Sequence, residues 1–261
     1  MTTRLPRSLR HEYEIYVERE IEDYKNSVPR TYLMGIADEA MRQIVASDQL
    51  GMSELLLAAE VDRVIAKRLR LPSYETWRKR RQKNATELQR PEHWGLRADT
   101  PLKAAIPSIP SLPGSSSVLV TGARVEGSAL FLAANGCDVT AVEPERDVVE
   151  RMLEHARAAG LDERVRAHVS DLHHWAPDGP LTAVICTPAA FDGLAPHERT
   201  RIIELLQSAT MDGGVHLVET IVAGQAMFDE VELRRQYDGW VISIVPDHGA
   251  SKTFMARKAV A

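Results

Sequence analysis

The chain has 261 residues, of which 44% are hydrophobic and 26% are charged, and its formal net charge is −5. This length holds one large domain or a domain with an extension, and the negative charge disfavours a general nucleic-acid binder. No apolar run approaches the length of a membrane span, and no apolar signal segment opens the chain, so we expect a cytoplasmic protein without membrane segments.

Residues 1–100 are predicted to form a helical N-terminal region. Tyr13, Val17, Ile21 and Tyr24 recur at helical spacing, and Pro29 ends this first helix. Three further helices are expected at residues 31–46, from a Ser53 N-cap towards Leu69, and at 74–83.

Charge is unevenly distributed over these helices. Acidic residues crowd positions 12–23, whereas positions 63–83 carry nine Lys or Arg residues around Trp77. The basic segment is interpreted as a solvated helix face or as a docking surface for the acidic helix, within one chain or across a dimer. A nucleic-acid contact is the weaker alternative.

Residues 101–116 are rich in proline and serine and are predicted to connect the two regions, with Leu102, Ile106, Ile109 and Leu112 as apolar anchors. Residues 117–261 then alternate predicted strands and helices, which indicates an α/β sheet with parallel strands. Strands are predicted at residues 118–121, 139–143, 165–169, 182–186, 214–220, 239–245 and 253–257. Helices are predicted at residues 127–134, 146–159, 196–208 and 229–237. The connection 246–252 is too short for a crossover helix, so the last strand is predicted to be antiparallel.

The segment 118–145, VLVTGARVEGSALFLAANGCDVTAVEPE, reads as strand, turn, helix, strand. Gly122 lies in the turn, and Glu143 ends the second strand about 20 residues later, where a carboxylate accepts hydrogen bonds from ribose hydroxyls. The first six residues of this segment, VLVTGA at 118–123, also resemble the corresponding segment of short-chain dehydrogenases. That family needs a downstream Tyr-x-x-x-Lys, and Tyr237, the sole tyrosine after the turn, is followed four residues later by Val241.

The remaining motifs resemble class I S-adenosylmethionine-dependent methyltransferases, and within them the tellurite-resistance (TehB-like) group. The resemblance extends from about Ser117 to Lys258 and rests on the order and spacing of several segments. These segments are LFLAANGCDV at 130–139, VSDL at 169–172, DGGVHLV at 212–218, ELRRQYDGW at 232–240 and FMARK at 254–258. It implies a Rossmann-like, seven-stranded, mostly parallel sheet whose last strand is antiparallel.

The resemblance also implies a site for S-adenosylmethionine. Gly122 and the neighbouring Arg124 would lie at the methionine end, and Glu143, followed by Pro144, would hold the ribose. Asp171 would accept from the adenine amino group, with Leu172 beside the ring. Cys186 and Thr187 would face the reacting methyl. These implied positions are Gly122, Arg124, Glu143, Pro144, Asp171, Leu172, Cys186 and Thr187.

The first glycine motif of this chain is degenerate. Val120 stands where the family has an acidic residue, and Arg124 and Glu126 stand where it has glycines. Glycine at such positions lets backbone approach a ligand, so Arg124 and Glu126 are expected to strain the turn, fill the pocket or pair with each other. The leading hypothesis is S-adenosylmethionine-dependent methyl transfer to a small molecule. A catalytically silent binding or scaffold protein is the alternative, and a nucleic-acid methyltransferase or binder is the second.

No catalytic residue or metal site emerges from the sequence. His173 and His174 are adjacent and lack ligand partners at metal-binding spacing, and Cys137 and Cys186 are expected to be free thiols. By analogy, the N-terminal helices are predicted to form a lid, a homodimer contact or a surface for a protein partner.

Overall fold

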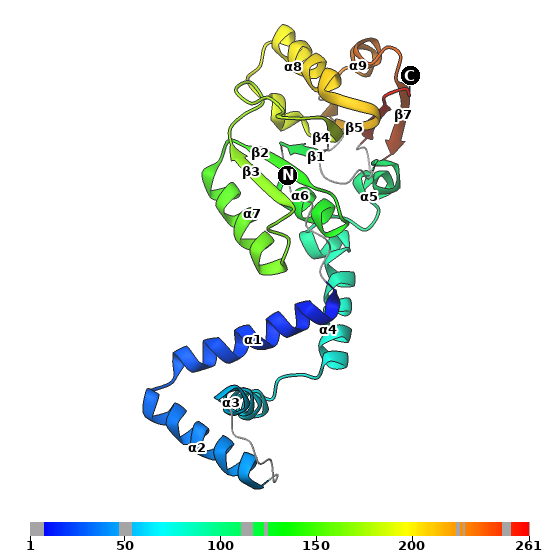
Figure 1. Ribbon diagram of the computed structural model, residues 1–261. Coiled ribbons are helices and arrows are strands. Elements are labelled where there is room, and N and C mark those ends of the chain that lie inside the picture. The colour runs from blue at the N-terminus through cyan, green and yellow to red at the C-terminus, as the bar shows by residue number, and fades with distance from the viewer. Residues whose placement is uncertain are drawn as a thin grey trace. The chain divides into compact units, whose positions relative to one another are not determined.

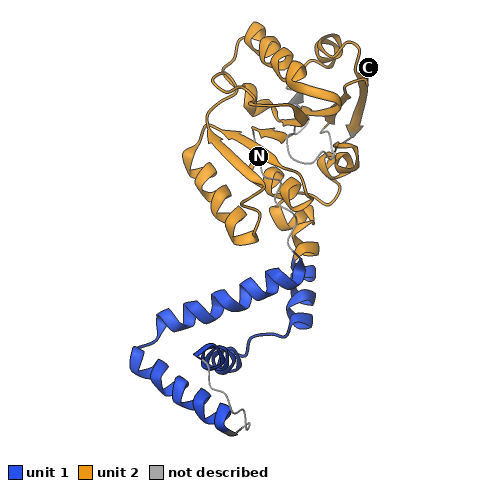
Figure 2. Cartoon of the chain, in the orientation of Figure 1, with its two compact units in different colours: residues 1–84 blue, residues 85–261 orange. Residues whose placement is uncertain are grey.

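The computed structural model describes residues 8–46, 54–110, 117–122, 125–222, 225–226, 228–246 and 252–260. Contacts divide the chain into two compact units, Met1–Asn84 and Ala85–Ala261, which we call the helical unit and the sheet unit (Figure 2). The sequence suggests a boundary near residue 100. The structure places it within a helix at Tyr74–Leu88, and Leu102 and Ala105 belong to the core of the sheet unit.

The helical unit consists of helices around a small core of its own (Figure 1). They are α1 (Leu9–Ser27), α2 (Arg30–Ala46), α3 (Glu54–Arg68) and the first part of α4 (Tyr74–Leu88). Ile21 of α1, Ile36 of α2 and Ile65 of α3 are buried together, as their helical spacing predicts. Ser8 accepts a hydrogen bond from the His11 N–H at 3.2 Å and caps α1. The predicted Ser53 cap lies outside the described residues.

An ion pair links the acidic and basic helices within one chain. Arg81 of α4 contacts Glu12 of α1 at 2.7 Å, with both side chains partly exposed. Tyr13 packs edge-on against Tyr74 at a centroid distance of 5.5 Å, and its hydroxyl donates to the Pro72 carbonyl at 3.0 Å. The acidic helix therefore contacts the basic helix intramolecularly, which is one of the arrangements that the charge pattern suggests.

The sheet unit is built on a mixed sheet with strand order β3-β2-β1-β4-β5-β8-β7, and the short β6 pairs with the end of β5. β1 (Ser117–Thr121), β2 (Val139–Glu143), β3 (Val165–Val169), β4 (Leu181–Cys186) and β5 (Thr210–Val222) run parallel. β8 (Lys252–Arg257) is antiparallel to both β5 and β7 (Val241–Pro246). The antiparallel last strand predicted from the short connection is confirmed.

Helices cover both faces of this sheet (Figure 1). Val118 and Val120 of β1 face a core shared with α5 (Pro101–Ala105), α6 (Val125–Ala134) and α7 (Arg146–Ala159). Leu119 faces the opposite core, with α8 (Pro196–Ala209) and α9 (Glu230–Gln236). Side chains of a strand alternate between faces, and a sheet covered on both faces needs apolar side chains on each.

The predicted strands and helices of the sheet unit are all present, with differences at their ends. β5 begins four residues earlier than predicted, and β6 (Gln225–Ala226) is a two-residue strand that the sequence pattern does not reveal. The connection includes α5 and the short helix η2 (Ile106–Ser108). Of the predicted apolar anchors, Leu102 and Ile109 are buried, and Leu112 lies outside the described residues. Two further short helices, η1 (Pro91–Trp94) and η3 (Pro188–Phe191), were not predicted. Within the described residues, no helix combines the length and apolarity needed to cross a membrane.

Candidate functional site

The carboxyl ends of β1 and β4 meet where the strand order reverses, the usual ligand edge of an open α/β sheet. Gly122 follows β1 with φ +91°, a conformation that favours glycine. A Cβ added there would lie 2.3 Å from Thr187 Oγ1, and the Thr187 N–H donates to the Thr121 carbonyl at 3.3 Å. The missing side chain thus lets the segment after β4 approach the turn after β1.

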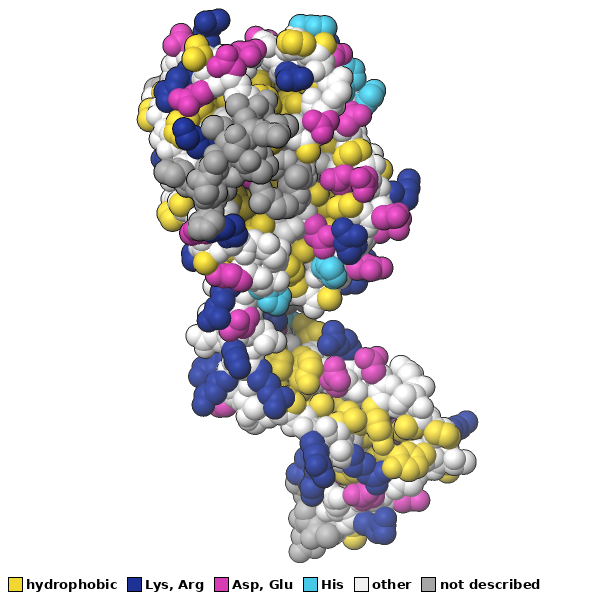
Figure 3. Space-filling view, turned by 180° about the vertical axis from the view of Figure 1, so that it is seen from behind, with side chains coloured by type: hydrophobic (Ala, Val, Ile, Leu, Met, Phe, Trp, Pro, Cys, Tyr) yellow, Lys and Arg dark blue, Asp and Glu magenta, His cyan; other side chains and the backbone are white. Residues whose placement is uncertain are grey.

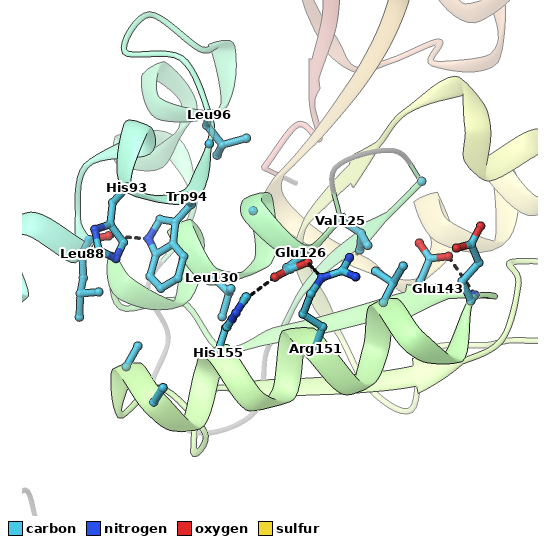
Figure 4. A pocket seen from close by; sticks show the side chains of 17 residues that line it. Leu88, His93, Trp94, Leu96, Val125, Glu126, Leu130, Glu143, Arg151 and His155 are labelled. Carbon is cyan, nitrogen blue, oxygen red and sulfur yellow. Dashed lines mark hydrogen bonds and ion pairs between the residues drawn. The ribbon is translucent and has the colours of Figure 1, made fainter.

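A cleft of about 790 Å³ opens beside this turn, between η1, α6 and α7. Glu143 lies at one end, which we call the polar end, and the Trp94 ring lies at the other end with Leu88 and His93 (Figure 4). The lining also includes Gly122, Glu145 and the apolar Leu130. Every lining residue lies in the sheet unit. The size suits a small organic ligand.

Glu143 ends β2 at the polar end of the cleft. Glu143 is only 9% exposed, and its Oε1 accepts a hydrogen bond from the Glu145 N–H at 3.0 Å. An ionised carboxylate has about four acceptor positions, so acceptor capacity remains after this bond. Glu143 is the last residue of β2, and this strand end is the position that the sequence predicts for the partner of the ribose hydroxyls.

Glu126 forms a charged cluster on the cleft wall with two residues of α7. Its Oε2 lies 2.8 Å from Arg151 Nε, and its Oε1 lies 2.6 Å from His155 Nδ1 (Figure 4). Arg151 and His155 share one face of α7 because they are four residues apart. The hydrogen bond and charge of Glu126 raise the pKa of Arg151 above its ordinary value.

The other residues of the degenerate motif are placed differently. Val120 is 1% exposed and belongs to the core beneath the cleft. Arg124 lies outside the described residues, so its predicted pairing with Glu126 stays a prediction. Among the described residues, the partners of Glu126 are Arg151 and His155 of α7, 25 and 29 residues further along the chain.

The turn after β3 contains Asp171 and Leu172, which do not line the cleft. Asp171 Oδ1 accepts from the N–H groups of His173 and His174 at 3.0 Å, and lies 2.8 Å from His174 Nδ1. Burial alone raises the pKa of Asp171, but the hydrogen bonds from His174 and His173 outweigh it and lower the pKa overall. Leu172 is 3% exposed and packs in the core near α8. Among the described residues, no group of three metal-ligating side chains is found.

A second, smaller cavity of about 70 Å³ lies at the ends of β4 and β5 and is lined by Cys186, Thr187 and Glu219. Cys186 is fully enclosed, and burial raises the pKa of its thiol to about 12, so it is not a ready nucleophile. Gly95 and Leu96 line both this cavity and the larger cleft. Pro144 is exposed and lines neither.

The structure therefore brings together Gly122 and Glu143 in one cleft, and Cys186 and Thr187 in another cavity. It adds Trp94, Arg151 and His155, which sequence reasoning missed. One sequence signal could have indicated Arg151 and His155. They are four residues apart, on one face of the helix that follows the acidic end of β2. Trp94 had none, because η1 is a four-residue element.

No family model and no curated protein matches the chain. Solved structures do resemble it. TehB from Haemophilus influenzae is 18% identical with a TM-score of 0.48, over 64% of this chain, and the chain spans 65% of the length of TehB. An rRNA methylase from Streptococcus thermophilus is 15% identical with a TM-score of 0.46, over 63% of this chain and 99% of its own. The N-methyltransferase NodS from Bradyrhizobium japonicum is 11% identical with a TM-score of 0.46, over 63% of this chain and 100% of its own.

The strand order β3-β2-β1-β4-β5-β8-β7, with β8 antiparallel to its neighbours, is a property of the structure itself. With its parallel strands β1 to β5, its antiparallel β8 and helices on both faces, the sheet unit has a Rossmann-like fold, as predicted from its sequence.

Proposed function

We propose that the chain binds S-adenosylmethionine in the cleft beside Gly122 and Glu143 and transfers its methyl group to a small-molecule acceptor. The observation that carries the proposal is the position of Glu143. Glu143 is the last residue of β2, and it lines the same cleft as Gly122, which follows β1. Ribose hydroxyls are the ligand groups that such a carboxylate accepts from.

The residues present suit this cofactor at the ribose end. The cleft volume of about 790 Å³ is ample for a nucleoside with an amino acid side arm. At the adenine end, Asp171 is half exposed and already accepts hydrogen bonds from its own turn. Its predicted contact with the adenine amino group depends on its remaining acceptor capacity.

S-adenosylmethionine supplies an electrophilic methyl group on a sulfonium. The protein's part is to hold that methyl in line with the acceptor and to exclude water, and positioning of this kind gives large accelerations without a dedicated base. Cys186 is disfavoured as an intermediate carrier because burial keeps its thiol protonated. The small cavity beside Thr187 is the proposed direction of acceptor approach.

Calorimetric titration with S-adenosylmethionine and S-adenosylhomocysteine tests the proposal. We expect micromolar binding that Glu143→Gln weakens about tenfold to hundredfold, the usual effect of losing charge-assisted hydrogen bonds. Glu154→Gln is the matched control, because Glu154 is an exposed residue of α7 outside the cleft lining. Absence of binding at millimolar ligand would refute the proposal and leave the silent scaffold as the better hypothesis.

A further inference from the structure

The cluster of Glu126, Arg151 and His155 on the cleft wall offers ligand-binding groups in addition to the proposed ribose contact at Glu143. Glu126 and Arg151 place a carboxylate and a guanidinium side by side on the lining of one cavity. The distance between Glu126 Oε2 and Arg151 Nε is 2.8 Å. Their side chains are 20% and 52% exposed, so the pair is open towards the cleft and is not sealed in the core. A ligand entering the cleft meets both charges.

Both groups retain hydrogen-bonding capacity. Arg151 has five N–H donors, and within the part of the chain that the structure describes its bond to Glu126 uses the one on Nε and leaves the two Nη groups. Each oxygen of Glu126 has two acceptor positions, and among the described residues each makes one bond, Oε2 to Arg151 and Oε1 to His155. Figure 4 shows the outer nitrogens of Arg151 pointing away from His155, into the cleft on the side of Glu143.

The chemical complement of such a pair is a zwitterion. An α-amino acid carries an ammonium and a carboxylate on one carbon. Its two opposite charges are therefore close together, as are the two charges of the Glu126–Arg151 pair. A carboxylate matches the paired Nη donors of a guanidinium, and an ammonium matches the free acceptor positions of a carboxylate. Val120, which stands at the position that is acidic in the resembling family, is buried and apolar and offers neither.

We propose that the Glu126–Arg151 pair is the receptor for the amino acid end of the ligand, with Arg151 binding its carboxylate and Glu126 its ammonium. The inference rests on the proposed function, because it takes the ligand to be an adenosyl amino acid whose ribose contacts Glu143. Glu126 then replaces a glycine of the motif with a binding group, and His155 is a positioning residue that holds its Oε1.

Three ligands distinguish binding of the amino acid end by Glu126 and Arg151 from a general effect of the substitutions on the cleft. S-adenosylhomocysteine has both charges, decarboxylated S-adenosylhomocysteine keeps the amine alone, and methylthioadenosine has neither. We expect Arg151→Gln to weaken S-adenosylhomocysteine about tenfold to hundredfold and to leave the other two unchanged. Glu126→Gln is expected to weaken both amine-bearing ligands and to leave methylthioadenosine unchanged. Arg157→Gln, an exposed position of α7 outside the cleft lining, is the control.

Each outcome bears on a different claim. Unchanged methylthioadenosine binding also establishes that a variant is folded. If Arg151→Gln weakens all three ligands alike, or none of them, the zwitterion receptor is overturned while the ribose site stands. If the wild-type protein binds none of the three, the proposed function fails and this inference fails with it.

Discussion

His216 belongs to a buried chain of hydrogen bonds whose direction follows from donor counting. The single hydroxyl proton of Thr210 is donated to the Leu206 carbonyl at 2.7 Å, so His216 Nε2 donates to Thr210 Oγ1, also at 2.7 Å. His216 Nδ1 is then the acceptor for the Tyr237 hydroxyl at 2.8 Å. The side-chain polar atoms of Thr210, His216 and Tyr237 each have a partner in this network, which is what burial of polar groups requires.

Removal of one hydroxyl leaves a buried acceptor without its donor. We expect Tyr237→Phe to lower the free energy of unfolding by about 1–3 kcal/mol, because His216 Nδ1 loses the Tyr237 hydroxyl. Urea denaturation followed by circular dichroism measures the change. Stability equal to wild type would show that the Tyr237 hydroxyl is not part of the network.

Burial, with a smaller effect of the Lys258 charge, lowers the pKa of His216 to about 3. In the unfolded chain the pKa is about 6.5, so between these values the unfolded state binds one proton more. Stability conferred by neutral His216 is therefore full above pH 6.5 and falls as the pH drops towards 3, by up to about 1.4 kcal/mol per pH unit. We expect urea denaturation between pH 7 and 4.5 to show this slope in the wild type and a shallower one in His216→Asn. Equal slopes would contradict the assignment.

At the scale of elements, one glycine decides how closely η1 packs on α6. A Cβ at Gly127 would lie 2.5 Å from the Trp94 carbonyl oxygen, closer than real Cβ contacts. Because η1 contributes His93 and Trp94 to the cleft, displacement of this element changes the cleft wall. The close approach therefore couples a residue of α6 to the shape of the site.

We expect Gly127→Ala to lower stability by about 1–3 kcal/mol and to weaken ligand binding, despite the better helix propensity of alanine. Gly35→Ala in α2 is the matched control, since nothing lies within 4 Å of its added Cβ. This control is expected to gain about 0.5–1 kcal/mol. Thermal unfolding measures the stability of each variant, and calorimetric titration with S-adenosylhomocysteine measures its affinity. A stabilised Gly127→Ala variant with unchanged affinity would contradict the packing argument.

The elements with strong periodic patterns were predictable and the site only in part. α7 has the predicted bounds because its apolar residues, including Val149, Met152 and Ala156, follow one helical stripe. Glu143 was predictable because a strand end and a following helix mark it locally. The partners of Glu126 were not, because side chains 25 and 29 residues away meet it only once α6 and α7 lie side by side.

At the scale of the whole molecule, the described cleft belongs to the sheet unit alone. Its lining runs from Leu88 to Ala159, whereas the helical unit has a separate core of Ile36, Ile65 and their neighbours. Lys and Arg side chains gather over α4 (Figure 3), where Lys79, Arg80 and Lys83 are exposed. A role of this unit in assembly, as a lid or in partner binding stays a prediction.

A chain of residues 72–261 keeps α4 and the sheet unit and removes α1 to α3. We expect it to bind S-adenosylhomocysteine with the affinity of the full chain, because no lining residue is lost. The predicted role of the helical unit would appear instead as a change in mass by light scattering or in the acceptors methylated. Loss of binding in a truncated chain whose circular dichroism retains the sheet would place part of the site in the helical unit.

Trp94 has an optical consequence. Its ring lines the cleft, and its Nε1 donates to the Leu88 carbonyl at 2.7 Å, which fixes the ring in place. The other tryptophans of the chain, Trp77, Trp175 and Trp240, do not line the cleft. The protein therefore contains its own fluorophore in the wall of the cleft. The part of an emission change that Trp94→Phe abolishes reports entry of a molecule into this cavity, whatever its chemistry.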